Sequence, residues 1–467
     1  MSFFNNESFG TVKDYINKNK AIISIITIFY FLPLFTTNTI STTRFLLTQL
    51  TTILIYSILA ISFELQLGRT GLLNFGHAAF FGIGAYVSGL LIGFSTNLPI
   101  LQFFFQYNPL ISWITILILA IITGMLIGGI MGLTTSRMKG TTFAFVALAI
   151  AMVLYYTFFL DPFLSGGETG RIVPPPNLYI NPLIYYIFSL IVTSLVVFLF
   201  VMVLIVDIKD RGEFLGFSFF SNPLNEIDEK KSVFQVFILL LKILIIILFL
   251  VALFLIYFFI IIPNVDGMNN AKLVSYRIIN EYYFVLSCSI LVYFFVKKLV
   301  NSPFGRVLAA ISQNEERAEA LGYNVYYYKI KSLGISGGIA GLAGALFAAH
   351  QGIINPDITL GVSITINAML YSIIGGLNTL LGSFVGSFFV NLNLIFANIN
   401  NDLWIILLGI FFILIVLFLP YGIVGTINVH SNWIKGILLR LKIKESDYWW
   451  ISFVGITIIL LIIISLI

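Results

Sequence analysis

Charged residues are scarce in this chain of 467 residues, of which Asp, Glu, Lys and Arg together make up 10%. A soluble domain carries about 25% charged residues, so this sequence has too little charge to cover a surface that faces water. Hydrophobic residues make up 59%, and apolar runs of about 20 residues, long enough to cross a hydrocarbon core of ~30 Å, recur along the chain. The strands of an outer-membrane barrel would instead alternate apolar and polar residues over ~10 positions. These features indicate an integral membrane protein built from helices.

Several kinds of chemistry are also missing. Cys288 is the only cysteine, so no disulfide can form within the chain, and its apolar surroundings predict a small buried hydrophobe. The three histidines, His77, His350 and His430, lack the spacing to Cys or carboxylates that a metal site needs. No glycine-rich loop ends in Gly-Lys-Ser or Gly-Lys-Thr, so the chain carries no nucleotide-binding loop of its own. We therefore expect no catalytic residue, no metal and no cofactor.

The apolar runs predict an all-α fold, a polytopic transmembrane helical bundle of about 11–13 spans. Residues 1–20 are polar, and no small-residue cleavage site follows the first apolar run, so we expect that run to be a retained span rather than a signal peptide. The expected spans are 21–36, 45–67, 78–94, 110–134, 141–160, 183–206, 234–262, 283–300, 329–349, 363–380, 382–397, 403–420 and 449–467.

The distribution of Lys and Arg predicts the orientation. If the N-terminus is cytoplasmic and every run crosses, the outside loops hold only Arg44, Arg171, Lys272 and Arg277, and Lys242 lies within a span. All other members of the 25 Lys and Arg fall in inside loops, as the positive-inside rule requires. The net charge of +5 therefore reflects topology, so we expect a lipid bilayer and no nucleic acid among the partners.

The segment 68–93 departs from the Ile, Leu and Phe of the other runs. Its recurring Gly and Ala allow helix backbones to approach closely in lipid. Asn74 and His77 are polar groups at membrane depth, where such groups face the bundle interior or a water-filled path; each could equally serve only to hydrogen-bond neighbouring helices. Glu64, near the inner end of its span, is expected to snorkel or to pair with another charge.

The segment 301–331 has helix signals of its own within a cytoplasmic loop. Ser302, followed by Pro, predicts one helix start, and Ser312 with Glu315 predicts a second by the capping-box rule. Gly322 is placed to end that second helix in a left-handed turn. These signals alone fit either an ordinary loop or a docking site for a partner.

The region 334–386 is rich in glycine. An apolar run containing Gly375-Gly376 predicts a helix break, a feature that lines substrate paths in many transporters. Three further pairs are spaced for close helix crossing: Gly334/Gly338, Gly337/Gly341 and Gly382/Gly386.

Taken in order, these motifs resemble the M-type permease subunits of branched-chain amino-acid ABC transporters, the LivM family. The resemblance extends over 40–170 and 283–425, and each motif is weak by itself. The runs that carry it are Gly71–Tyr86, Lys139–Ala144, Ser165–Gly170, Ser302–Arg306, Ala310-Ile311, Asn314-Glu315, Ala318–Gly322, Ala340–Gly344, Pro356, Gly375-Gly376 and Pro420–Gly425.

The resemblance implies a function and a set of partners. The chain would be the permease subunit, not itself an enzyme, of an ATP-driven importer for branched-chain (hydrophobic) amino acids that works by alternating access. Its location would be the cell (plasma or inner) membrane. Its partners would be a second permease subunit, two ABC ATPase subunits and an external solute-binding protein.

The resemblance also implies two groups of site residues. A coupling helix within 303–322 would dock on the ATPase through Gly305, Arg306, Asn314, Glu315, Glu316, Ala318, Glu319, Ala320, Leu321 and Gly322. The translocation path would be lined by Asn74, Gly76, His77, Phe80, Gly82, Tyr86, Gly166, Gly167, Thr169, Gly375 and Gly376.

Five segments are expected. Residues 1–20 form a cytoplasmic N-terminal segment, 21–172 the first permease part, 173–282 an insertion with an extra pair of spans and a cytoplasmic loop, 283–425 the second permease part, and 426–467 a basic loop with an extra span.

Other functions stay open at this point. A urea or short-chain amide permease fits the same pattern, because specificity in such systems lies largely with the binding protein. An ion-driven secondary transporter is disfavoured by the scarcity of intramembrane carboxylates and His relays, and a membrane-embedded enzyme by the lack of a clustered nucleophile, metal or acid–base pair.

Overall fold

The structure is a computed structural model that describes residues 40–95, 109–162, 165–174, 176, 213–214, 217–218, 270–391 and 421–429, with single residues between 409 and 419. The chain forms two compact units. One comprises Met1–Thr43, Tyr186–Ser275 and Ile443–Ile467, and the other comprises Arg44–Tyr185 and Tyr276–Lys442. The predicted spans 21–36, 183–206, 234–262 and 449–467 lie outside the described residues. The five expected segments stay a prediction.

In the first unit the described residues include a short antiparallel hairpin. Its strands are β2 (Glu213–Phe214) and β3 (Phe217–Ser218), with Glu213 opposite Ser218. This hairpin lies in the stretch that the sequence predicts to be a cytoplasmic loop.

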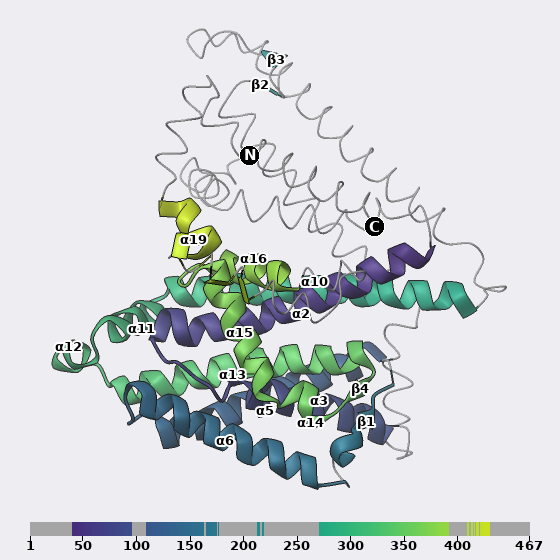
Figure 1. The fold of residues 1–467 in the computed structure, drawn as a ribbon, viewed down its shortest axis with the longest axis horizontal. Coiled ribbons are helices and arrows are strands. Elements are labelled where there is room, and N and C mark those ends of the chain that lie inside the picture. Colours follow the sequence, from purple (N-terminus) through teal and green to yellow (C-terminus); the bar gives the residue numbers. More distant parts are fainter. Residues whose placement is uncertain are drawn as a thin grey trace, which may run out of the picture. The chain divides into compact units, whose positions relative to one another are not determined.

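The second unit is a bundle of α-helices (Figure 1). Its long helices are α2 (Ile40–Thr70), α3 (His77–Ser95), α5 (Pro109–Thr135), α6 (Gly140–Leu160), α10 (Asn270–Asn301) and α13 (Val325–Gln351); the first residues of α2 and α10 belong to the other unit. Six helical segments of the described chain are long and apolar enough to cross a membrane: Phe45–Thr70, Ile111–Thr135, Gly140–Leu160, Arg277–Asn301, Val325–Gln351 and Pro356–Gly375. The polytopic helical bundle is thus confirmed, and the total of about 11–13 spans stays a prediction.

The two ends of this unit differ (Figure 1). The short helices α11 (Pro303–Gln313) and α12 (Glu315–Ala320) project at one end, and α13 runs from there to the other. At the far end β4 (Ile353–Ile354) pairs antiparallel with β1 (Arg171–Ile172) beside the short helix α14 (Pro356–Thr359). The loop between α5 and α6 reaches the α12 end, where Lys139 Nζ lies 3.4 Å from Glu316 Oε1. Two loops that the Lys and Arg distribution assigns to the inside therefore meet.

Helices α3, α5 and α13 cross at backbone contact. A Cβ on Gly337 would meet the carbonyl oxygen of Gly124 in α5, and a Cβ on Gly344 would meet that of Phe81 in α3. Between apolar helices in lipid, such close approach lets dispersion forces hold the pair. The predicted crossing role of Gly337 is confirmed. Gly334 lies at the same crossing, since a Cβ on Gly128 of α5 would be 3.1 Å from its Cα, although a Cβ on Gly334 itself would make only an ordinary contact, 3.6 Å from the Met125 carbonyl oxygen.

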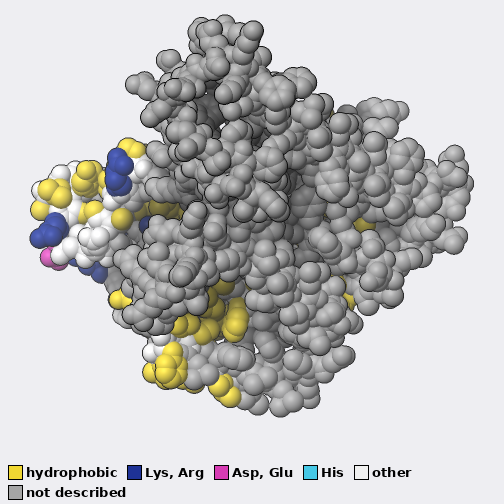
Figure 2. Space-filling model, turned by 90° about the horizontal axis from the view of Figure 1, so that it is seen from above, with side chains coloured by type: hydrophobic (Ala, Val, Ile, Leu, Met, Phe, Trp, Pro, Cys, Tyr) yellow, Lys and Arg dark blue, Asp and Glu magenta, His cyan; other side chains and the backbone are white. Residues whose placement is uncertain are grey.

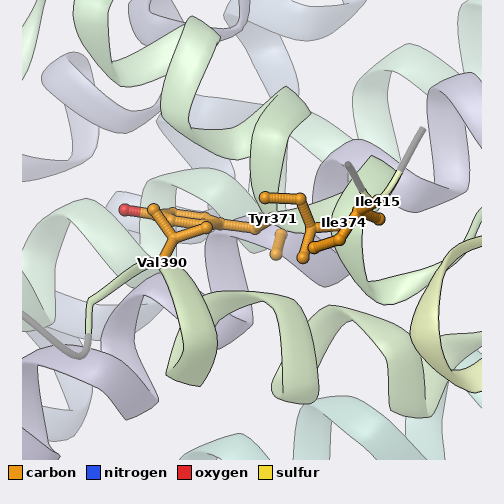
Figure 3. Packing of buried hydrophobic residues seen from close by; sticks show 5 residues of the cluster. Tyr371, Ile374, Val390 and Ile415 are labelled. Carbon is orange, nitrogen blue, oxygen red and sulfur yellow. The ribbon is translucent and has the colours of Figure 1, made fainter. Parts of the chain in front are cut away.

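Helices α15 (Val362–Gly375) and α16 (Leu380–Val390) form a second packed group. Figure 3 shows Tyr371 and Ile374 of α15 packing with Val390 and Ile415, and Ala60 of α2 belongs to the same buried cluster. The Gly-Gly pair breaks the helix as predicted, because α15 ends at its first glycine. The predicted span near 363–380 corresponds to the observed segment Pro356–Gly375, which ends five residues earlier because the turn after Gly375 separates α15 from α16.

The glycines of α16 keep this group tight. A Cβ on Gly386 would meet the carbonyl oxygen of Tyr371, and a Cβ on Gly382 would lie 2.6 Å from that of Gly375. The predicted close approach at Gly382/Gly386 is confirmed. A short helix, α19 (Gly422–Val429), follows, and a Cβ on Gly422 would meet the backbone of Gly376.

Candidate functional site

The projecting segment begins where the sequence predicts. Ser302 adopts an extended backbone before α11, its hydroxyl accepts a hydrogen bond from the Gly305 N–H at 3.4 Å, and Pro occupies the first helical position. Pro suits that position because its missing N–H would have no helical partner there. Gly305 permits a close approach, since a Cβ on it would meet the backbone of Val300.

The second start differs from the prediction. Ser312 belongs to the last turn of α11, where its hydroxyl donates to the Ala309 carbonyl oxygen at 2.9 Å. Asn314 is the cap instead: its backbone is extended and its Oδ1 accepts from the Arg317 N–H at 2.9 Å. The capping-box prediction is wrong because an Asn two residues later offers an equally good cap. Gly322 ends the segment with a φ of 86°, as predicted.

Buried contacts hold α12 in place. Ala318 packs with Val307, Ile311 and Val325, which join α11, α12 and the start of α13 in one apolar cluster. Lys329 of α13 is buried, and its Nζ lies 2.6 Å from Glu315 Oε1. A buried cation requires such a partner, because an unpaired charge in a low dielectric is costly.

The opposite face of this segment is exposed. Side chains of Glu316, Arg317, Glu319 and Ala320 face outward, and Leu321 is 70% exposed. On the face drawn in Figure 2, the Lys, Arg, Asp and Glu side chains of the described chain gather at the end that α11 and α12 occupy. A projecting face with charges around an exposed Leu fits contact with another protein.

The residues predicted from the segment 68–93 lie inside the bundle. Asn74 Oδ1 accepts from the Gly76 N–H at 2.8 Å, and its Nδ2 donates to Gln66 Oε1 at 3.0 Å. His77 Nε2 lies 2.7 Å from Ser62 Oγ, and its ring contacts Phe80 edge-on. These contacts position α3 against α2, so in this conformation the side chains are packed rather than open to a path.

A second helix break lies next to Gly82 and Tyr86. The span Pro356–Gly375 consists of α14 and α15, interrupted at Leu360, and a Cβ on Gly82 would meet the Leu360 side chain. The Tyr86 hydroxyl is buried near Thr359 and has no hydrogen-bond partner among the described residues. No glycine pair or proline stands at this break, and the single Gly361, which precedes α15, is too weak a signal to predict it.

The remaining predicted residues fall in two places. Gly166 and Gly167 have φ values of 79° and 62° and form, with exposed Thr169, the turn before β1 at the β1–β4 end. Gly375 and Gly376 are buried between α15 and α16. The structure thus brings Gly82 and Tyr86 together at one break and separates them from the glycine pair.

One buried polar group was missed by the sequence analysis. His350 Nδ1 lies 2.7 Å from Glu281 Oε1, and its Nε2 lies 2.9 Å from Thr52 Oγ1. The three residues come from α13, α10 and α2 and are far apart in sequence, so no local pattern could reveal them. In the described part of the chain, no three His, Cys, Asp or Glu side chains cluster as metal ligands would.

Comparison with known proteins gives a consistent family. The model of the branched-chain amino acid transport system permease component matches residues 45–417. The chain is 22% identical to the high-affinity branched-chain amino acid transport system permease protein LivM of Escherichia coli K12 over 377 residues, which are 79% of this chain and 68% of that protein.

Two shorter matches are closer in identity. Over 94 residues, 20% of this chain, it is 34% identical to the probable branched-chain amino acid transport permease protein LivM of Methanocaldococcus jannaschii, of which the match spans 27%. Over 96 residues, 20% of this chain, it is 30% identical to the autoinducer 2 import system permease protein LsrC of Salmonella typhimurium, of which the match spans 28%. No solved structure matches the chain.

Proposed function

The chain belongs to the family of branched-chain amino acid transport system permease components, and we propose that it is the membrane-spanning permease subunit of an ATP-driven importer for branched-chain and similar hydrophobic amino acids. The observation that carries the proposal is the family match over 45–417, which runs from α2 past α16 and includes the projecting segment. Permeases of this family are not themselves enzymes. The chain is a membrane protein, and we place it in the cell membrane.

Importers of this kind combine a permease with an ATPase and other subunits. For this chain we propose a second permease subunit, two ABC ATPase subunits and an external solute-binding protein. The support for the ATPase is the projecting segment, which lies at the end predicted to be cytoplasmic and exposes a face that no described residue covers.

The predicted coupling residues divide into two kinds of role. Gly305, Asn314, Glu315 and Ala318 shape and anchor the segment, through the contacts described above. The outward side chains would touch the ATPase: Arg306, Glu316, Glu319, Ala320 and Leu321, with Gly322 ending the helix. Motion of the ATPase on ATP binding and hydrolysis would then move this rigid segment, and the bundle would open inward.

The path for the amino acid is proposed near the α14–α15 break. Interrupted helices line substrate sites in transporters because their ends present unpaired backbone groups. Here Gly82 and Tyr86 lie beside the break. Asn74 and His77 would take part after helix movement, because they are packed in this conformation. Gly166, Gly167 and Thr169 would act at the β1–β4 end, and Gly375 and Gly376 at the α15–α16 turn.

The alternatives are weaker. The family and the LivM relatives favour amino acids over urea or short-chain amides. The Glu281–His350 pair adds an intramembrane carboxylate and histidine, yet both are engaged with each other and nearly inaccessible, so an ion-driven secondary transporter gains little from it.

Co-purification tests the docking face. The double variant Glu319→Lys, Leu321→Asp changes only exposed side chains, so it should leave the fold intact and remove the ABC ATPase that co-purifies with the tagged wild type. We expect the amount of captured ATPase to fall at least about tenfold, because Leu321 would be an apolar anchor buried at the interface and Glu319 a charge beside it. Mass spectrometry of the captured proteins gives the readout.

The matched control is Glu168→Lys, an exposed carboxylate in the turn before β1. It should retain the ATPase. Equal recovery of the ATPase with the double variant would place docking elsewhere, and a wild type that captures no ABC ATPase would contradict the importer proposal.

A further inference from the structure

The turn that joins α15 to α16, Gly376–Thr379, is held by two charged side chains of α2. Glu64 is fully buried, and its Oε1 accepts a hydrogen bond from the Asn378 N–H at 2.5 Å. Arg69 Nη2 donates to the Asn378 carbonyl oxygen at 2.7 Å. Both backbone groups of one residue are thus bound by a single helix end.

This turn needs external support. Asn378 has a φ of 67°, and in the described chain it is the non-glycine residue with positive φ. The left-handed region is unfavourable for side chains with a Cβ, although Asn tolerates it better than most. Packing holds the start of the turn, where Gly376 is buried against Gly422. Leu377 and the Asn378 side chain are exposed, so at Asn378 the contacts to α2 are what fixes the backbone.

The sequence of α2 leaves room for the carboxylate. A Cβ on Gly68, one helical turn after Glu64, would occupy the position of the carboxylate oxygens. The second oxygen of Glu64, Oε2, is buried with no hydrogen-bond partner among the described residues. A buried polar atom without a partner calls for an explanation, and this oxygen is available to a different donor if the turn moves.

The same end of α2 lies against the projecting segment of α11 and α12, which is the proposed docking segment for the ATPase. Gly71 follows the last residue of α2 with a φ of 74°, and a Cβ on it would lie 3.2 Å from Ser312 Cα in α11. Thr70 Oγ1 lies 2.7 Å from Ser332 Oγ in α13. Two residues after Arg69, directly beyond the end of α2, the chain therefore meets the segment that the proposed function assigns to the ATPase.

We propose that Glu64 and Arg69 form a clasp through which the docking segment controls the α15–α16 turn. Displacement of Ser312 against Gly71 shifts the last turn of α2, and Glu64 and Arg69 then release Asn378. They are positioning residues and need not touch the transported molecule. The part played by the ATPase rests on the proposed function, whereas the clasp itself does not.

The clasp is tested by the reactivity of a single thiol. Cys288 is the only cysteine, so Cys288→Ser gives a background in which Leu377→Cys reports the turn and Leu321→Cys reports the docking segment. In the purified permease, Arg69→Gln and Gly68→Ala should each speed maleimide labelling at 377 by about tenfold, the factor expected from loss of one charge-assisted hydrogen bond. Labelling at 321 should not change.

Two variants make the test specific. Gly68→Ala keeps every charge and displaces only the carboxylate, and its control is Gly129→Ala, where a Cβ meets nothing within 4 Å. Glu64→Gln keeps an acceptor for the Asn378 N–H and should fall between the wild type and Glu64→Ala. Unchanged labelling at 377 in both Arg69→Gln and Gly68→Ala would overturn the clasp.

A second arm tests transmission in the assembled complex. In the Cys288→Ser, Leu377→Cys permease with Arg69 unchanged, trapping the ATPase with ATP and vanadate should change the rate of labelling at 377. When Arg69→Gln is added, this response should be lost while the ATPase still co-purifies. A response that persists in Arg69→Gln would overturn transmission through the clasp. If no ATPase co-purifies at all, the proposed function fails while the first arm still decides the clasp.

Discussion

Gly344→Leu is expected to prevent accumulation of the folded permease. Gly344 lies where α13 crosses α3, and any Cβ there would collide with the carbonyl oxygen of Phe81, which is backbone and cannot rotate away. Overpacking of a well-packed interior costs about 1–3 kcal/mol and occasionally more, and this clash is with the backbone of α3 at both Phe81 and Ala85, so we expect a cost of about 3 kcal/mol or more. The measurement is the yield of monodisperse protein after solubilisation, with its midpoint of thermal unfolding.

The control for this prediction is Gly129→Leu in α5. It adds the same side chain to a transmembrane helix, at a position where a Cβ would meet nothing within 4 Å. Yield and unfolding midpoint should stay near those of the wild type. If both leucines were tolerated equally, backbone contact between α3 and α13 would not be what holds the bundle together.

Glu315→Gln is expected to destabilise the docking segment more than Lys329→Met does. The Lys329 side chain is 2% exposed and that of Glu315 is 26% exposed. Loss of the carboxylate therefore leaves a buried cation without a partner, whereas loss of the cation leaves a carboxylate that water can reach. Breaking a buried pair by removing one partner costs about 3–5 kcal/mol, so we expect about 3 kcal/mol for Glu315→Gln.

The double variant separates this explanation from a general sensitivity of the site. Glu315→Gln and Lys329→Met together remove both charges, so no buried cation remains unpaired. The unfolding midpoint should therefore lie above that of Glu315→Gln alone. The local readout is protease cleavage within 314–324. Equal losses for the two single variants, or an additive loss in the double variant, would show that the 2.6 Å contact is not a coupled pair.

Much of the helical architecture could be predicted because its signals are local. Long apolar runs predicted the spans near α2, α3, α5, α6, α10 and α13. Most of these helices extend a few residues beyond the predicted ends, and α10 begins 13 residues before the predicted start at 283. Ser302 with Pro, and Gly322, are recognisable because cap and turn conformations depend on one or two residues. Ser312 was a wrong choice because two cap residues compete within three positions, and the structure selects Asn314.

The tertiary polar contacts could not be predicted. Glu64 was expected to snorkel or pair with another charge, yet its Oε1 binds the backbone of Asn378, more than 300 positions away in sequence. Glu281, His350 and Thr52 likewise meet from three helices. Composition and periodicity describe which face of a helix is apolar, and they carry no information on which distant residue that face will contact. Lys242, the other charge expected in a span, lies outside the described residues.

The most direct measurement is uptake of radiolabelled leucine by proteoliposomes that contain this permease with its second permease subunit and the ABC ATPase of the same organism, supplied with the binding protein outside. The account predicts leucine accumulation that requires ATP on the ATPase side and is abolished by the Glu319→Lys, Leu321→Asp variant. Accumulation driven by a proton or sodium gradient without ATP, or ATP-dependent uptake of urea in place of leucine, would contradict it.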